Sequence, residues 1–350
     1  MAKSSVLGFP RIGLHREMKK ALESFWRGNT SQIELLETAR KIRIDNWKTM
    51  SAMGVTEIPS NDFSLYDHVL DTAIMLGAIP LRYQPFFKNS ELEGYFSMAR
   101  GTDGKGQDAI SALEMTKWFN TNYHYIVPEI DPDTEFKLND TKIISEYKEA
   151  RTLGLETRPI ILGPVTFLML SKSLNNSFNP ISKLADLIPI YADLLKNLKE
   201  VGVEWVQIDE PFLVMDFSSQ LEEHYNLTYK NLTTNENRPK IMLSAYFEAP
   251  YNIPAFCGLP TEGLHFDVVS SPSLIKSISV IPSEKFVSLG IIDGRNIWRA
   301  NLAEKYSLIE KVIRRIGRER LIVSSSCSLM FIPQDVEIED TIPEEIKTSL

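Results

Sequence analysis

Two adjacent carboxylates, Asp209 and Glu210, follow an apolar run in the segment 202–211, which has the sequence GVEWVQIDEP. The run is rich in β-branched and aromatic residues, as is typical of a strand buried on both faces. Pro211 ends it because proline cannot donate a further ladder hydrogen bond. Active sites of α/β proteins usually lie at the carboxyl ends of such strands. The two carboxylates are therefore a candidate general acid and base, as in a glycosidase. The alternative is that Asp209 caps the next element and Glu210 faces solvent.

A second group of candidate residues is basic. Gly8, Pro10 and Gly13 punctuate a predicted strand-to-helix turn. Five basic residues crowd this turn and the start of the helix: Arg11, His15, Arg16, Lys19 and Lys20. Free N–H groups and partial positive charge at a helix start would make this cluster a receptor for carboxylates or phosphate. The alternative is a solvated basic helix face that Glu17 and Glu23 partly neutralise.

The histidines and cysteines have no metal-binding spacing. The five histidines are scattered without an HxH or HxxxH pair, and the two cysteines form no CxxC. His265 falls inside a predicted strand and is expected to be a core histidine. Cys327 is expected to be a small buried hydrophobe. No GxGxxG or P-loop motif is present, so the sequence gives no support to nucleotide binding.

The elements that must position these residues alternate between short apolar runs and longer helical patterns. Eight runs are predicted strands: 6–10, 55–61, 159–167, 203–208, 240–247, 263–269, 286–293 and 321–326. Eight strand–helix units in a chain of this length favour an α/β fold of the (βα)8 TIM-type barrel, with an open doubly wound sheet as the alternative. Ser31 and Glu34 have the spacing of a capping box, and Gly317 ends an amphipathic helix at 301–316.

Between the second and third strands the pattern departs from a simple crossover. Helices are predicted at about 64–76, 91–99 and 108–119, which makes a helical amino-terminal excursion. We expect one domain over residues 1–333, followed by an acidic tail, 334–350, that begins a truncated inter-domain linker. If the barrel is right, several polar residues lie at its carboxyl-end mouth: Arg11, Asn61, Asp62, Asp209, Glu210, Glu248, Asp293 and 324–327.

Composition excludes several classes of protein. The 350 residues are 43% hydrophobic and 24% charged, as in a soluble globular protein, and a net charge of −8 argues against nucleic-acid binding. Two cysteines are too few for a disulfide framework and suit a reducing, cytoplasmic location. The polar start lacks a signal-peptide pattern, and no apolar run of about 18 residues predicts a membrane span.

Seven segments together carry a resemblance to a known family. They are LGFPRIG (7–13), REMKK (16–20), EMTKWFNTNYHYIVPE (114–129), LGPVTF (162–167), EWVQIDEP (204–211), DGRNIWRA (293–300) and SSSCSL (324–329). In this combination the chain resembles the amino-terminal half of the cobalamin-independent methionine synthases. These enzymes transfer a methyl group from 5-methyltetrahydropteroyl-triglutamate to homocysteine.

The resemblance implies a fold and a ligand site. The family has two facing (βα)8 barrels, of which this chain resembles the first. Carried over by motif, the residues that contact 5-methyltetrahydropteroyl-triglutamate are Arg16, Glu17, Met18, Lys19 and Lys117. A triglutamate tail is a flexible polyanion that basic side chains could bind. Trp118 and Phe119 are expected to pack rather than to stack on the pterin.

The departures from the family's second barrel are also informative. There, a His-x-Cys pair, a Glu and a later Cys hold a zinc that activates the homocysteine thiol. In the equivalent strands this chain has Ser244, Tyr246 and Val269, and only Cys327 remains. We therefore expect no metal and no cofactor in this chain, with zinc in the carboxy-terminal half. Because the IDEP motif recurs in both barrels, a structural role is favoured here for its two carboxylates.

Three functions stay open at this point. The first is a folate-binding, scaffold half of a methyltransferase, inactive alone, whose partner is the carboxy-terminal catalytic barrel in cis or in trans. The second is an independent barrel hydrolase that uses Asp209 and Glu210. The third is a non-catalytic barrel that binds a partner and has lost the folate site.

Overall fold

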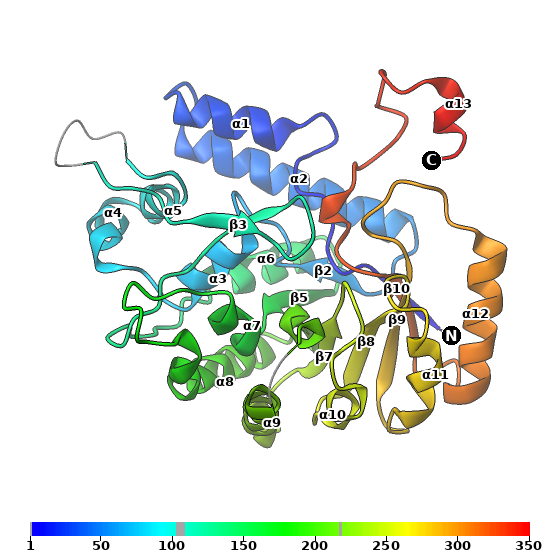
Figure 1. The fold of residues 1–350 in the computed structure, drawn as a ribbon. Helices are drawn as coiled ribbons and strands as arrows, with labels where there is room; N and C mark the ends of the chain where they lie inside the picture. The colour runs from blue at the N-terminus through cyan, green and yellow to red at the C-terminus, as the bar shows by residue number, and fades with distance from the viewer. Residues whose placement is uncertain (1, 103–108, 217–218) are drawn as a thin grey trace.

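Eight parallel strands form the centre of the molecule (Figure 1). The structure is a computed structural model that describes residues 2–102, 109–216 and 219–350. The strands are β1 (Lys3–Ser5), β2 (Ile58–Ser60), β5 (Thr157–Leu162), β6 (Trp205–Asp209), β7 (Lys240–Ala245), β8 (Gly263–Asp267), β9 (Phe286–Ile292) and β10 (Leu321–Ser325). Their order in the sheet is β1-β10-β9-β8-β7-β6-β5-β2. A parallel bridge between Ser5 and Glu57 joins the two outer strands, so the sheet closes and the predicted (βα)8 class is confirmed.

Helices surround the strands (Figure 1). Their bounds are α1 (Glu17–Trp26), α2 (Gln32–Ala52), α3 (His68–Met75), α4 (Gln84–Asn89), α5 (Glu91–Arg100), α6 (Thr141–Thr152), α7 (Pro164–Met169), α8 (Leu184–Glu200), α9 (Ser219–Thr234), α10 (Ile253–Gly258), α11 (Leu274–Ser277), α12 (Leu302–Ile316) and α13 (Glu344–Lys347). The capping box is confirmed, because the Ser31 N–H donates to Glu34 at 2.8 Å and the Glu34 N–H donates back at 3.3 Å. In the described part of the chain, no helix is both long and apolar enough to cross a bilayer.

The predicted excursion between β2 and β5 is confirmed as a feature, but one of its elements is wrong. In place of a helix at 108–119 the structure has a hairpin of β3 (Met115–Lys117) and antiparallel β4 (His124–Ile126); Asp108 itself lies outside the described residues. All three residues of β3 are exposed, so they offer no apolar face that a helix could bury. Lys117 therefore stands on a strand, opposite His124.

Among the strands, the first and third differ most from their predicted bounds. The first strand is Lys3–Ser5 rather than 6–10, because Gly8 adopts φ +136° and leaves the extended conformation. The strand predicted at 159–167 ends at Leu162, and α7 starts at Pro164, whose fixed φ suits the first turn of a helix.

A buried carboxylate holds the start of α7. Glu210 is fully buried and accepts the N–H groups of Thr166 at 2.7 Å and Val165 at 3.3 Å, and the Tyr229 hydroxyl at 3.1 Å. The first N–H groups of a helix have no intrahelical partner, so an acceptor from another element stabilises this start. Glu210 thus joins β6 to α7, and the structural role favoured for it is confirmed.

A chain of polar side chains runs through the barrel interior to Asp209. Arg158 donates to Ser5 at 2.7 Å and to Gln207 at 2.9 Å, and Gln207 donates to Asp209 at 2.7 Å. The Tyr246 hydroxyl donates to the other Asp209 oxygen at 3.2 Å. Burial raises the pKa of Asp209 to about 7, against a usual 3.8. Between these two pH values the folded protein holds a proton on Asp209 that the unfolded chain releases.

We predict that Gly163→Ala destabilises the fold by about 2–4 kcal/mol, since both overpacking and a displaced buried acceptor are costly. A Cβ at Gly163 would lie 2.1 Å from a Glu210 oxygen and force the carboxylate off the start of α7. Urea unfolding measures the effect. The matched control is Gly258→Ala, where a Cβ meets nothing within 4 Å and we expect a change below about 0.5 kcal/mol. Equal effects at the two positions would contradict the prediction.

We predict a pH dependence of stability that Asp209→Asn reduces. Because the folded pKa is about 7 and the ordinary value 3.8, the free energy of unfolding falls as pH rises between these values and levels off above 7. One proton contributes at most about 1.4 kcal/mol per pH unit. Urea unfolding at a series of pH values should give a shallower fall for Asp209→Asn, whereas Asp133→Asn at an exposed position should keep the wild-type fall. Parallel curves for Asp209→Asn and wild type would refute this account.

Candidate functional site

The residues assigned to ligand binding in segment 16–19 divide into exposed and structural ones. Arg16 and Lys19 are exposed, and the Arg16 side chain has no hydrogen-bond or ion-pair partner among the described residues. Lys19 lies 4.0 Å from Glu23, at the limit of an ion pair. Glu17 accepts the His15 N–H at 2.9 Å, and Met18 is fully buried. Arg16 is therefore free for an anion and Lys19 is held only by an exposed ion pair with Glu23, while the side chains of Glu17 and Met18 stabilise the turn and the packing of α1.

The turn before α1 is built as the sequence indicates. Gly13 has φ +83°, and a Cβ there would lie 2.3 Å from the Glu17 carboxylate. Arg16, the N-cap of α1, is itself left-handed with φ 62°. Arg11 is not free for a ligand, because it donates to the carbonyl oxygens of Ser64 at 3.2 Å, Leu65 at 3.3 Å and Tyr66 at 2.7 Å. The basic cluster thus has one structural member, and His15, Arg16, Lys19 and Lys20 are exposed.

Lys117 is exposed on β3, and within residues 2–102, 109–216 and 219–350 nothing forms a hydrogen bond or ion pair with its ammonium group. The next residue, Trp118, is only 1% exposed and contacts the rings of His68 and Tyr125 edge-on. Phe119 lies 5.7 Å from Phe247, ring to ring. Both aromatic residues therefore pack, as predicted, and they seat the hairpin over the carboxyl end of the barrel.

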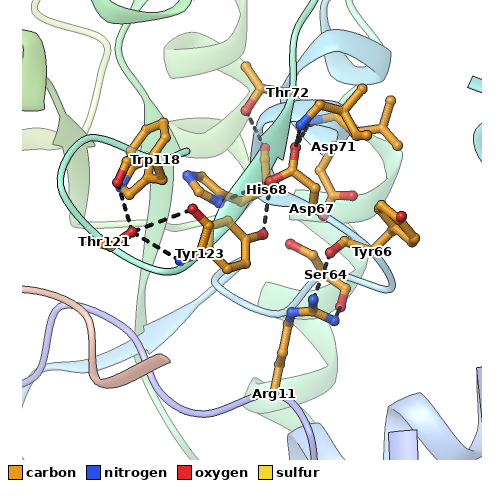
Figure 2. A network of polar contacts seen from close by, with 12 residues as sticks. Arg11, Ser64, Tyr66, Asp67, His68, Asp71, Thr72, Trp118, Thr121 and Tyr123 are labelled. Carbon is orange, nitrogen blue, oxygen red and sulfur yellow. Dashed lines mark hydrogen bonds and ion pairs between the residues drawn. The ribbon is translucent and has the colours of Figure 1, made fainter. Parts of the chain in front are cut away.

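One carboxylate fixes the hairpin to the barrel. Figure 2 shows Asp67 next to Tyr123, whose hydroxyl donates to Asp67 at 2.8 Å. The other Asp67 oxygen accepts the N–H groups of Leu70 at 2.9 Å and Ile126 at 3.0 Å. Burial raises the pKa of Asp67, and these three donors oppose that shift by stabilising the charged form. Asp67 was not predicted as a site residue, because an Asp before a helical pattern signals an N-cap but not a bond to a strand 59 residues away.

The segment 64–67 consequently carries both halves of the candidate site. Its carbonyl groups hold Arg11 at the foot of the basic turn, and its last residue, Asp67, holds the hairpin of Lys117 (Figure 2). The Tyr95 hydroxyl accepts the N–H groups of Tyr66 at 3.0 Å and Asp67 at 3.2 Å, so the segment is itself fixed from α5. Two regions about 100 residues apart in sequence are thereby brought to one end of the barrel.

A cavity of about 110 Å³ lies under the hairpin, at the mouth of the barrel. Its charged and titratable lining includes Asp62, His68, Asp71, Lys142 and Asp209. Burial raises the pKa of Asp62 to about 6 and lowers that of His68 to about 4, so the imidazole is neutral at pH 7 and forms no ion pair with Asp67. Lys142 is shared by Asn61 at 2.9 Å and Asp71 at 3.4 Å. The cavity is acidic and offers no free cation to an anionic substrate.

The IDEP carboxylates do not form an acid/base pair. Asp209 faces this cavity, whereas Glu210 is bound to the start of α7 by backbone N–H groups. A glycosidase needs two carboxyl groups on either side of one substrate bond. Because Glu210 is committed to α7, the hydrolase alternative loses one of its two groups.

The remaining residues predicted at the mouth follow strand ends but are occupied with their own neighbours. Asn61 donates to the Ile160 carbonyl at 2.7 Å, Asp293 accepts the Arg295 N–H at 2.8 Å, and Glu248 accepts the Ser271 hydroxyl. Each of these polar groups stabilises a loop that follows a strand, and Asn61 also lines the cavity.

Two of the positions that the family resemblance compares with zinc ligands, Ser244 and Cys327, are buried, and the nearby core histidine His265 is fully hydrogen-bonded. Burial raises the pKa of the Cys327 thiol to about 12, so it is protonated at neutral pH. Ser244 is buried, and both ring nitrogens of His265 are hydrogen-bonded, to Ser288 at 2.9 Å and to the Ser326 carbonyl at 3.1 Å. Among the residues that the structure describes, no three His, Cys, Asp or Glu side chains are grouped to hold a metal. The absence of zinc from this chain stays a prediction.

Comparison with known proteins identifies the family. The family model described as "Cobalamin-independent synthase, N-terminal domain" matches residues 3–317. The chain is 44% identical to a 5-methyltetrahydropteroyltriglutamate–homocysteine methyltransferase of Caulobacter vibrioides, over 98% of this chain and 46% of that protein. It is 45% identical to the enzyme of the same name in Bradyrhizobium diazoefficiens, over 99% and 46%. The chain thus spans about half the length of these curated relatives.

Solved structures support the fold. A B12-independent methionine synthase from Shewanella sp. W3-18-1 superposes with a TM-score of 0.68 at 11% identity, covering 97% of this chain and 94% of that one. A putative vitamin-B12-independent methionine synthase from Listeria monocytogenes gives a TM-score of 0.60 at 13% identity, covering 94% and 90%. With the match over residues 3–317, these results establish that the chain belongs to the cobalamin-independent synthase family, as its N-terminal domain.

Proposed function

We propose that this chain is the folate-binding half of a 5-methyltetrahydropteroyltriglutamate–homocysteine methyltransferase. Arg16, Lys19 and Lys117 bind the triglutamate tail of the methyl donor. The observation that carries this proposal is that these long basic side chains are exposed and that Arg16 and Lys117 are free of carboxylate partners. The names of the relatives, which include the same triglutamyl folate, supply the ligand class.

The charge pattern supports a polyanion over a neutral ligand. The chain carries a formal net charge of −8, so a flexible anion is repelled by the surface as a whole. Charge-assisted hydrogen bonds from Lys and Arg to carboxylates are about twice as strong as neutral ones, and free cations can overcome this repulsion locally. Glu17 and Met18 contribute through the shape of the turn rather than through side-chain contacts to the ligand.

Catalysis requires a second barrel in this proposal. Methyl transfer to homocysteine needs the thiol as a thiolate, and a metal or a nearby base normally provides it. We infer that this chain does not provide the metal: Cys327 is buried as a thiol, and the described residues include no group of three His, Cys, Asp or Glu side chains that could hold an ion. The carboxy-terminal barrel, in the same polypeptide or as a separate chain, supplies the zinc and the homocysteine site.

We predict that Lys117→Ala weakens binding of 5-methyltetrahydropteroyltriglutamate roughly tenfold, since one charge-assisted contact is lost. Isothermal titration of the purified chain measures the dissociation constant. The loss should be much smaller for the monoglutamyl form, and the wild-type affinity should fall with added salt. Lys148→Ala on α6 is the control, because Lys148 is also exposed and lies on the outer helical layer. Absent binding by the wild type, or unchanged affinity of Lys117→Ala, would contradict the proposal.

We also predict that the 350-residue chain alone does not methylate homocysteine and that activity appears when a zinc-loaded carboxy-terminal barrel of a relative is added. Methionine formation in the presence of the triglutamyl folate is the readout. The carboxy-terminal barrel alone serves as the control. Methylation by the chain unaided would overturn the assignment of the catalytic groups to the other barrel.

A further inference from the structure

Lys117 stands on an element that cannot hold its own position. The strands β3 and β4 are three residues long each, and a two-stranded hairpin of this size is at best marginally stable by itself. The Lys117 side chain is exposed and has no partner in the described chain. Its place relative to α1 must therefore be set by contacts of the hairpin with other elements.

Asp67 forms hydrogen bonds with hairpin residues on either side of His124, the residue that pairs with Lys117. Lys117 pairs with His124 in the antiparallel ladder. Asp67 accepts the hydroxyl of Tyr123 at 2.8 Å and the N–H of Ile126 at 3.0 Å, one residue before and two residues after His124. The two bonds use different oxygens of one buried carboxylate, so they fix the strand in position and in rotation.

The same segment fixes the other cations. Arg11 binds the carbonyl groups of residues 64–66, and the turn continues through Arg16, whose N–H donates to the Gly13 carbonyl at 3.0 Å. The start of α1 is tied back by the Met18 N–H, which donates to the Ile12 carbonyl at 3.0 Å. The stretch 64–67 thus makes polar contacts both with the turn before α1, through Arg11, and with the hairpin, through Tyr123 (Figure 2).

We infer that Asp67 is a positioning residue for the triglutamate tail: its carboxylate holds Lys117 at a fixed separation from Arg16 and Lys19, and so sets the preference for a long polyglutamate chain. This inference rests on the proposed function. A monoglutamyl ligand has fewer carboxylates and a shorter reach than a triglutamyl one, so under this inference its affinity depends less on the position of Lys117. A triglutamyl ligand contacts the cations of both α1 and the hairpin, so its affinity depends on the hydrogen bonds that Asp67 makes to the hairpin.

The test compares Asp67→Ala with Asp67→Asn in titrations with tri- and monoglutamyl folate. The measured quantity is the affinity for the triglutamyl folate divided by that for the monoglutamyl folate. Alanine removes all three hydrogen bonds that Asp67 accepts, so we expect this ratio to fall roughly tenfold, as predicted for loss of the Lys117 contact itself. Asparagine keeps an oxygen for the two N–H groups, and its amide can donate to the Tyr123 hydroxyl. The asparagine variant should therefore restore most of the ratio.

A double-mutant cycle with Lys117→Ala shows whether Asp67 acts through Lys117. Adding Asp67→Ala to Lys117→Ala should leave the ratio unchanged, because the positioned charge is already absent. If Asp67→Ala lowers the affinity ratio by a similar further factor when Lys117 is already alanine, its effect is a general structural one and the inference is overturned. If Lys117→Ala by itself has no effect, the proposed function fails instead, which separates the two failures.

Tyr123→Phe provides a test if Asp67→Ala does not fold. It deletes only the hydroxyl that Asp67 accepts, so the ratio should fall by a few-fold. Tyr125→Phe is the matched control on the same hairpin, since its hydroxyl donates to the Leu170 carbonyl at 3.0 Å and not to Asp67. Equal ratios for Tyr123→Phe and wild type, or equal losses for the two tyrosine variants, would overturn the inference.

Discussion

A buried carboxylate needs several hydrogen-bond donors around it, and the donors to Asp67 come from different elements at the carboxyl end of the barrel. An unsolvated anion is costly unless it is hydrogen-bonded, so its donors cannot be separated cheaply. Here they come from the first turn of α3 and from two positions of the hairpin. The same short segment receives Arg11 from the turn before α1. A helix, a hairpin and a basic turn that are distant in sequence are thus held in one arrangement.

At this end of the barrel, three carboxylates are buried in structural contacts, whereas three basic side chains are exposed. Glu210 stabilises the start of α7, Asp209 ends the interior polar chain, and Asp62 accepts the Phe9 N–H at 2.8 Å. These carboxylates have become structural, and burial raises the pKa of each of the three. In contrast, Arg16, Lys19 and Lys117 remain at the surface. The proposed binding of an anion rests on these exposed cations, while the three carboxylates serve the fold.

Sequence reasoning succeeds where the signal is local and fails where it is not. Strands such as β7 and β9 are apolar runs between turn residues, and they are predicted close to their observed bounds. The strand β1 is missed because Lys3–Ser5 is polar, and it is recognisable only once β10 pairs with it. The first strand of the hairpin, β3, is missed because its residues are exposed and the hairpin is bonded to a carboxylate 56 and 59 residues earlier. Exposure of Arg16 and Lys19 follows from the helix pattern, but Asp67 carries no local sign of its long-range bonds.

An acidic protein that binds a polyanion needs its cations held in place rather than merely present. Screening in physiological salt limits the reach of each charge to about 8 Å, so scattered lysines would not attract the ligand in concert. A lysine side chain also loses rotamer freedom on binding, at a cost of up to about 2 kcal/mol, and any backbone freedom would add to that cost. A hairpin fixed by two hydrogen bonds to one carboxylate removes the backbone part before the ligand arrives. In the proposed function, the buried Asp67 carboxylate thereby favours binding of the glutamate tail, because it helps to immobilise the hairpin that carries Lys117.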